Sequence, residues 1–160
     1  MANDIESTFL KVVNENLGIA HKIARVYFDD PMSREDVVQE MMFQLWRSYP
    51  SFDHRSKFST WMYRVCLNTA LTHFSKSKKF SSQQLTDSHY NIPDPESARD
   101  DMDIMLSAIS MLPKLNRAIV LLYLEGMSYE EIASITGLSQ KNVGVRLFRI
   151  RKELTEFVNR

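Results

Sequence analysis

A basic run near the carboxyl end carries the most distinctive chemistry in this chain. Between Leu138 and Lys152 there are five basic residues and no acidic one. Lys and Arg side chains bond phosphate oxygens, and Arg or Asn can also bond base edges in the major groove of DNA. The alternative is an ordinary solvated helix face, but such faces usually mix both signs of charge. We therefore favour DNA binding, through Lys141, Asn142, Val145, Arg146, Arg149 and Lys152.

Two helices joined by a tight turn are predicted to position this run, over residues 126–154. Ser128 is a favourable N-cap, and Glu131 completes a Ser-x-x-Glu capping box. Gly137 lies where the chain must reverse, which favours a residue that tolerates positive φ. Ser139 then caps the second helix. Its apolar residues recur at helical spacing and are Val143, Leu147, Ile150 and Leu154. This pattern is typical of a DNA-binding helix-turn-helix.

Three earlier helices are also predicted from apolar periodicity. The first runs from Ile5 to Phe28, and the second from Arg34 to Tyr49 with Ser33 as its N-cap. The third runs from Thr60 to about Lys76, with Ser59 as its N-cap. Few glycines and few β-branched runs fit these helices, so we expect an all-α fold.

The second of these helices has two dissimilar faces. Its expected core residues are Val38, Met41, Met42 and Leu45. Its expected surface residues are Asp36, Gln39, Glu40, Phe43 and Arg47. An exposed Phe43 beside acidic and amide groups would suit a protein-binding surface. The periodicity equally allows Phe43 to lie in a second layer of the core.

The loop from Ser51 to Ser59 and the helix after it combine aromatic rings with cations. Rings can stack on unpaired bases while cations hold the backbone, so this combination suits single-stranded nucleic acid. The alternative is that Trp61 and Phe74 are core residues. The sequence leaves both interpretations open.

Charge is balanced overall but distributed unevenly along the chain. Lys and Arg together number 20, as do Asp and Glu. Residues 54–86 contain six cations and no acid, and residues 114–160 carry a net charge of +3. Between them, residues 87–103 carry six acids and one cation. Two basic blocks around an acidic spacer indicate local nucleic-acid contact rather than a general polycation.

The sequence shows no pattern typical of a catalytic, metal or cofactor site. Its four His residues are scattered and no phosphate-cradling glycine loop appears. Cys66 is the single cysteine, which fits a reducing cytoplasm. No signal peptide or long apolar run is visible, so we expect neither export nor membrane contact.

Two long motifs resemble those of bacterial RNA polymerase sigma factors. They are DVVQEMMFQLW…SFDHRSKFSTWMYRVCLNTAL and LPKLNRAIVLLYLEGMSYEEIASITGLSQKNVGVRLFRIRKEL. The chain is most similar to the extracytoplasmic-function (ECF) group of the sigma-70 family. The resemblance implies a region 2 bundle at 1–80, an acidic flexible linker at 81–103 and a region 4 helix-turn-helix domain at 104–160.

The resemblance also implies three sets of contact residues. Those for the beta-prime clamp helices of core polymerase are Asp36, Gln39, Glu40 and Phe43. Those for the promoter minus-ten element are Asp53, His54, Arg55, Ser56, Lys57, Phe58, Trp61, Arg64, Asn68 and Thr72. Those for the minus-thirty-five element are Lys141, Asn142, Val145, Arg146, Phe148, Arg149 and Lys152. The chain departs from its relatives at Gly144 and Val145, where they often carry polar residues.

The implied function is that of a non-catalytic initiation factor. It would bind core polymerase, including the beta flap, direct it to promoters and help open the duplex. An anti-sigma factor is a further partner that the family suggests. The alternative is a stand-alone helix-turn-helix regulator, which would bind its duplex tightly without polymerase.

Overall fold

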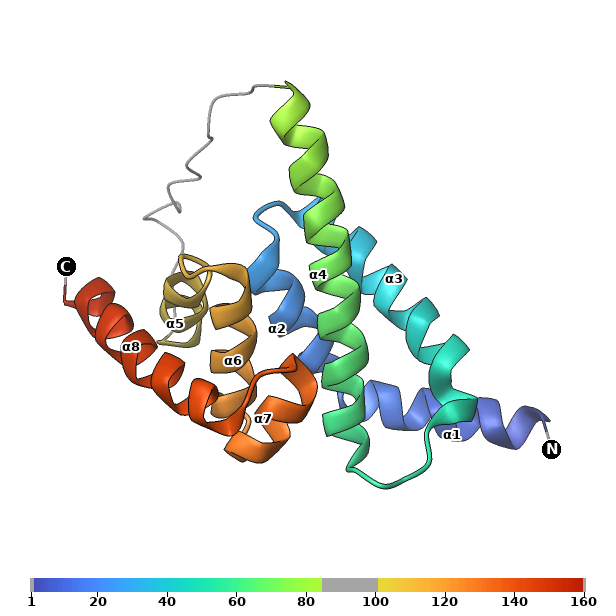
Figure 1. The fold of residues 1–160 in the computed structure, drawn as a ribbon. Helices are drawn as coiled ribbons and strands as arrows, with labels where there is room; N and C mark the ends of the chain where they lie inside the picture. Colours follow the sequence, from blue (N-terminus) through green and yellow to red (C-terminus); the bar gives the residue numbers. More distant parts are fainter. Residues whose placement is uncertain (1, 85–100, 160) are drawn as a thin grey trace. The chain divides into compact units, whose positions relative to one another are not determined.

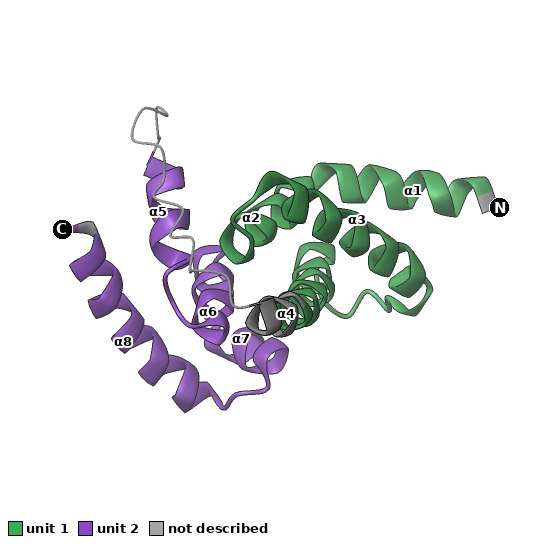
Figure 2. Cartoon of the chain, turned by 90° about the horizontal axis from the view of Figure 1, so that it is seen from above, with its two compact units in different colours: residues 1–90 green, residues 91–160 purple. Residues whose placement is uncertain are grey.

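The helices fall into two groups in the computed structural model, which describes residues 2–84 and 101–159. Every element within those residues is helical (Figure 1). The chain divides into two units, unit 1 at residues 1–90 and unit 2 at residues 91–160 (Figure 2). The predicted all-α, two-domain architecture is therefore confirmed.

The prediction of one continuous helix from Ile5 to Phe28 is wrong, because the helix is interrupted at Asn16. Helix α1 (Ala2–Glu15) and helix α2 (Leu17–Tyr27) replace the single helix expected there. The Asn16 side-chain amide donates to the carbonyl of Val12 at 2.8 Å. Its φ of −116° is not helical. Asn side chains compete for backbone groups in this way, and the apolar pattern that continues across the break could not reveal it.

Helix α3 (Pro31–Ser48) begins three residues earlier than predicted, and its N-cap is Asp30 rather than Ser33. The Asp30 carboxylate accepts the backbone N–H of Ser33 at 2.9 Å. Pro31 occupies the first turn, where its missing N–H costs nothing. A short 3₁₀ turn, η1 (Tyr49–Ser51), follows.

Helix α4 (Phe58–Gln84) is longer than predicted at both ends. Ser59 lies inside its first turn and is not a cap, since the Trp61 N–H bonds the carbonyl of Lys57 at 3.1 Å. Towards its other end, no Gly or Pro interrupts the sequence before Gln84. The helix therefore extends into the start of the predicted linker, and residues 85–100 of that linker lie outside the described residues.

The core of unit 1 forms where α4 packs against α2 and α3. Its most deeply buried large side chains are Ile23, Met41, Leu45, Met62, Tyr63 and Leu67. Val37 is fully buried, whereas Val38 and Met42 are only half-buried. The buried face of α3 is therefore rotated slightly from the predicted one, so that Val37 rather than Val38 lies in the core.

Unit 2 begins with α5 (Asp101–Ile109) and α6 (Lys114–Leu124), which supply most of its core. Helices α7 (Tyr129–Thr136) and α8 (Gln140–Val158) form the helix-turn-helix, and both pack on α6. Gly126, after α6, has φ +84° and allows the chain to turn towards α7.

The local signals that predicted the helix-turn-helix are confirmed. The Ser128 hydroxyl accepts the backbone N–H of Glu131 at 3.1 Å. Gly137 ends α7 with φ +81°, and the Ser139 hydroxyl accepts the N–H of Asn142 at 3.1 Å. The buried stripe of α8 contains Val143, Leu147 and Ile150, with Leu154 half-buried.

Candidate functional site

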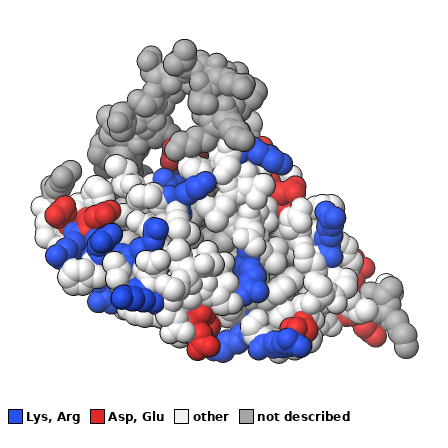
Figure 3. Space-filling model, viewed as in Figure 1, with Lys and Arg blue, Asp and Glu red and all other residues white. Residues whose placement is uncertain are grey.

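The solvent-facing side of α8 is here called the reading face. Its members are all exposed and are Lys141, Asn142, Val145, Phe148, Arg149 and Lys152. Lys and Arg atoms gather over α8 in Figure 3. The buried stripe fixes this orientation, because Val143, Leu147 and Ile150 lie on the opposite side of the helix. The arrangement can present cations to phosphates, and Arg or Asn to base edges.

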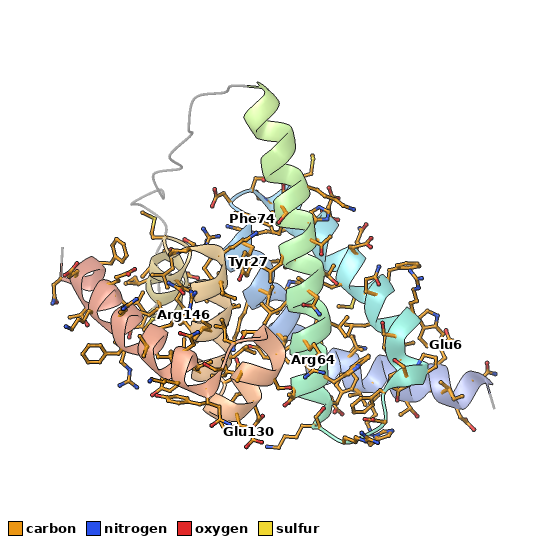
Figure 4. The ribbon with its side chains drawn as sticks, in the orientation of Figure 1. Glu6, Tyr27, Arg64, Phe74, Glu130 and Arg146 are labelled. Atoms are coloured by element: carbon orange, nitrogen blue, oxygen red, sulfur yellow. The ribbon has the colours of Figure 1, made fainter. Side chains whose placement is uncertain are left out.

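Arg146 was predicted to belong with these residues, but its side chain is less exposed than theirs. It is half-buried, and its Nη1 donates to Oδ1 of Asn116 on α6 at 3.1 Å (Figure 4). Arg146 therefore lies at the edge of the predicted set and also ties α8 to α6. Asn116 is 30 residues away in sequence, and no local pattern could have paired the two.

Phe148 is the aromatic member of the reading face, and it is 61% exposed. The ammonium of Lys152 lies 4.7 Å from its ring centroid, which holds a cation over the aromatic surface. A second such contact places the Arg151 guanidinium 5.1 Å from the ring centroid of Tyr123, where it also donates to the Tyr123 hydroxyl. The sequence prediction did not include this second pair.

Every residue of the loop before α4 from Asp53 to Lys57 is exposed. The Asp53 carboxylate accepts the backbone N–H of Arg55 at 3.1 Å and lies 3.1 Å from the Nε of Arg55. His54 has φ +62°, the left-handed conformation that glycine normally supplies. Backbone strain of this kind is found preferentially at binding loops.

An aromatic cluster, formed by Tyr49, Phe52, Phe58 and Trp61, supports this loop. Phe52 is central, with centroid distances of 5.1 Å to Trp61 and 5.8 Å to Phe58. The His54 ring lies 4.5 Å from that of Phe52. Trp61 and Phe58 are half-buried, so each is anchored in the cluster while part of it stays accessible. Phe74 packs instead on Tyr27 and Phe28, as a core residue would.

One face of α4 continues from the loop. Arg64, Asn68 and Thr72 recur every four residues and are all exposed. A hollow of about 530 Å³ lies along this face (lining residues Glu40, Gln44, Asn68, Thr69, Thr72, His73 and Lys76). The hollow brings Glu40, from the predicted polymerase-binding set, next to Asn68 and Thr72, from the predicted minus-ten set.

The outer side of α3 is here called the docking face. It comprises Asp36, Gln39, Glu40 and Phe43, all exposed. Phe43 is 56% exposed, so the second-layer core interpretation is wrong. The Glu40 carboxylate accepts the Gln44 amide at 3.0 Å, which orients it. Trp46 is also 46% exposed on α3, and the sequence prediction left it out.

Cys66 lies on α4 but is completely buried. Burial disfavours the thiolate and raises the pKa of this thiol to about 12. A thiol in this state is a packing residue rather than a nucleophile.

Comparison with known proteins identifies the family. Residues 12–80 match Sigma-70 region 2, and residues 102–154 match Sigma-70, region 4. The chain is 30% identical over 152 residues to the RNA polymerase sigma-H factor of Pseudomonas aeruginosa, covering 84% of this chain and 79% of that protein. It is 33% identical to the ECF RNA polymerase sigma-E factor of Haemophilus influenzae, covering 73% of this chain and 70% of that protein. The chain belongs to the ECF group of the sigma-70 family.

Two solved structures share this fold. The sigma factor RpoE of Bartonella quintana, solved with the anti-sigma factor NepR, superposes with a TM-score of 0.77 and 22% identity, covering 95% of this chain and 97% of that one. CnrH, solved with the cytosolic domain of CnrY, superposes with a TM-score of 0.66 and 22% identity, covering 96% of this chain and 89% of that one. The same fold is thus found in proteins with little sequence identity to this chain.

As a sigma factor, this protein binds core RNA polymerase, directs it to promoters and helps open the DNA for initiation. The family consists of initiation factors rather than catalysts. Within residues 2–84 and 101–159, no helix combines the length and apolarity that crossing a bilayer requires.

Proposed function

We propose that this sigma factor divides its work between three surfaces. The docking face of α3 binds the beta-prime clamp helices. The loop Asp53–Phe58 and the exposed face of α4 hold the opened minus-ten element. The reading face of α8 enters the major groove of the minus-thirty-five element.

The exposure of Phe43 carries the docking assignment. An aromatic side chain that is 56% exposed, with Gln39 and Glu40 beside it, has the composition of a binding hot spot with a polar rim. The side chain of Gln44 already orients the Glu40 carboxylate. Part of the surface is therefore preorganised before polymerase arrives.

The aromatic cluster supports the minus-ten assignment. Flipping a base costs a few kcal/mol, which contacts to the flipped base and the single strand must offset. The accessible parts of Phe58 and Trp61 offer stacking surfaces, and Arg55 and Lys57 offer cations to the backbone. Arg64, Asn68 and Thr72 extend the contact along α4.

The reading face supports the minus-thirty-five assignment. An α-helix of about 10–12 Å diameter fits a major groove about 12 Å wide. We assign residues 1–80 to polymerase and minus-ten binding and residues 104–160 to minus-thirty-five binding. Residues 81–103 form the connection, and the second domain also meets the beta flap.

The cellular compartment in which this protein acts follows from its partners. Promoter DNA and core polymerase are cytoplasmic in bacteria, so we place the protein there, with no enzymatic role. The RpoE structure named above contains an anti-sigma partner. By analogy, a protein inhibitor of that class is proposed for this chain.

A binding titration tests the docking face. Phe43→Ala should weaken binding to core polymerase roughly tenfold, since truncation of an anchor residue typically costs over 1 kcal/mol. Glu40→Ala should weaken it by a smaller factor. Glu6→Ala, which removes an exposed carboxylate on α1, is the matched control. If all three variants bind core polymerase alike, the docking face is not where we place it.

A further inference from the structure

The hollow beside α4 has chemistry that the three proposed surfaces do not use. It lies between α3 and α4, which pack against each other (Figure 1). Its volume of about 530 Å³ falls in the range of small-molecule sites. Some residues along its walls belong to neither the predicted polymerase-binding set nor the predicted minus-ten set. They are Gln44, Thr69, His73 and Lys76.

Contacts within the fold hold the walls of this hollow in place. The His73 ring packs edge-on against the buried ring of Phe28, with 5.6 Å between the centroids and 80° between the ring planes. The Thr69 hydroxyl donates to the carbonyl of Val65 at 2.8 Å. A ligand therefore meets walls that are already shaped, which lowers the entropic cost of binding.

Glu40 supplies the acceptors of the hollow. Its carboxylate has about four lone-pair positions, and the bond from the Gln44 amide at 3.0 Å takes one of them. Both oxygens can therefore accept from a ligand that presents two adjacent N–H groups. Among the nucleic-acid bases, guanine has such a pair, N1–H and the exocyclic N2 amine, on its Watson–Crick edge. The other bases have no two adjacent donors there, so one carboxylate oxygen would face an acceptor and be repelled.

One side of α4 lines the hollow with donors. Asn68, Thr72 and Lys76 recur every four residues, so Lys76 lies about 12 Å beyond Asn68 along the helix. The Asn68 amide can donate to guanine O6, and Lys76 can bind phosphate as a point charge. A smaller hollow of about 360 Å³ adjoins at Thr72 and Lys76, with Leu71 and Ser75 as its other described lining residues. The two hollows together therefore suit a base at one end and phosphates at the other.

Access to the hollow favours a free nucleotide over a base of the opened promoter strand. Glu40 is exposed in the chain alone. In the proposed function, polymerase covers Glu40 before any promoter strand is opened. A ligand that bonds Glu40 must therefore arrive before polymerase does. This step rests on the proposed docking of α3.

We propose that the hollow binds a free guanine nucleotide. The Glu40 carboxylate accepts from N1 and N2 of the base, the Asn68 amide donates to O6, and Lys76 bonds the phosphates. Because Glu40 also belongs to the docking face, the bound nucleotide competes with core polymerase and reduces holoenzyme assembly.

Isothermal titration calorimetry of the full chain with GDP tests the site. GDP should bind, and guanosine, which has no phosphate, should bind about tenfold more weakly, as expected for a lost hydrogen bond between charged groups. Lys76→Ala should weaken GDP binding by a similar factor. Lys11→Ala, which removes an exposed lysine on α1, is the matched control and should bind GDP as wild type does. If the two variants bind GDP alike, the phosphates are not held at Lys76.

Exchange of the carboxylate tests how the base is read. Wild type should prefer GDP to ADP by about tenfold. Glu40→Gln replaces two acceptors by one acceptor and one donor, the pattern complementary to the Watson–Crick edge of adenine. The variant should therefore lose or reverse the preference, whereas a general structural defect would weaken both nucleotides and leave their ratio unchanged. An unchanged ratio would show that Glu40 does not read the base.

A single-stranded oligothymidylate with one guanine, titrated in parallel, separates the two sources of guanine. If this strand binds in a Lys76-dependent way and GDP does not, the ligand is a DNA strand and the free-nucleotide proposal is overturned. If neither binds at about 1 mM, the hollow is not a guanine site.

Competition with polymerase separates this proposal from the docking assignment. GDP should weaken the binding of wild type to core polymerase and should have a smaller effect on Lys76→Ala. If GDP binds the chain without weakening its binding to core, the proposed competition is wrong. The Phe43→Ala titration then shows whether the docking face fails as well: a weakened variant keeps the docking face, and an unaffected one removes it while the guanine site stands.

Discussion

Arg146 and Arg149 lie three residues apart on α8 in different environments. Arg149 is exposed on the reading face, whereas Arg146 is half-buried and bonded to Asn116. Periodicity predicted the exposure of Arg149 because burial follows the apolar stripe. It could not predict the role of Arg146, because that role depends on a side chain from another helix.

This difference gives a prediction at the scale of single residues. Arg146→Ala should lower the stability of unit 2 by about 1 kcal/mol, because it leaves the Asn116 side-chain carbonyl without its donor. Arg149→Ala should leave stability unchanged. Native-state hydrogen exchange of α6 and α8 measures both effects. Equal protection in the two variants would show that the Asn116 contact contributes nothing to the fold.

Phe43 illustrates how far residue patterns reach. Its position on α3 was compatible with either a surface or a second-layer core location, and only packing decided between them. Its 56% exposure is a tertiary property, set by where α4 and α2 cover α3. The resemblance to sigma factors pointed to the surface before the fold did.

At the scale of elements, helix ends were predictable where a single local signal was present. Ser128 and Ser139 cap α7 and α8 as expected. At α3 two candidate caps compete, Asp30 and Ser33, and the first prevails because Pro31 suits the first turn. The break at Asn16 and the extension of α4 to Gln84 had no comparable signal.

The Asp30 cap can be tested by mutation. Asp30→Ala should destabilise unit 1 by about 1 kcal/mol at neutral pH, the usual cost of losing an N-cap. Asp29→Ala, which removes the adjacent exposed carboxylate, is the control. Trp46 and Trp61 are the two tryptophans of the chain and both belong to unit 1. Tryptophan fluorescence during urea unfolding therefore reports this unit selectively.

The same cap has a defined pH dependence. Hydrogen bonds from the side chain and backbone of Ser33 lower the pKa of Asp30 below its ordinary value of 3.8. A lowered pKa in the folded state means that the stabilisation is complete above pH 3.8 and is lost as pH falls through the lowered value. Wild type and Asp30→Ala should converge in stability there. A difference that persists unchanged at lower pH would show that the carboxylate is not the cap.

At the scale of the whole molecule, an overall charge of zero conceals an uneven distribution. Lys and Arg concentrate in two separate blocks, one from the loop before α4 onward and one along α8. Composition alone would have argued against nucleic-acid binding. The distribution of charge along the chain instead indicated local nucleic-acid contact, and the family motifs predicted the two-domain fold correctly.

A sigma factor depends on polymerase to select promoters, and that dependence separates it from a stand-alone regulator. Reconstituted transcription with mapping of RNA 5′ ends measures it most directly. Core polymerase with this chain should initiate at discrete sites preceded by two shared elements about two helical turns apart, and the chain alone should bind the same DNA weakly. If core polymerase produces the same distribution of ends with and without the chain, the account is contradicted.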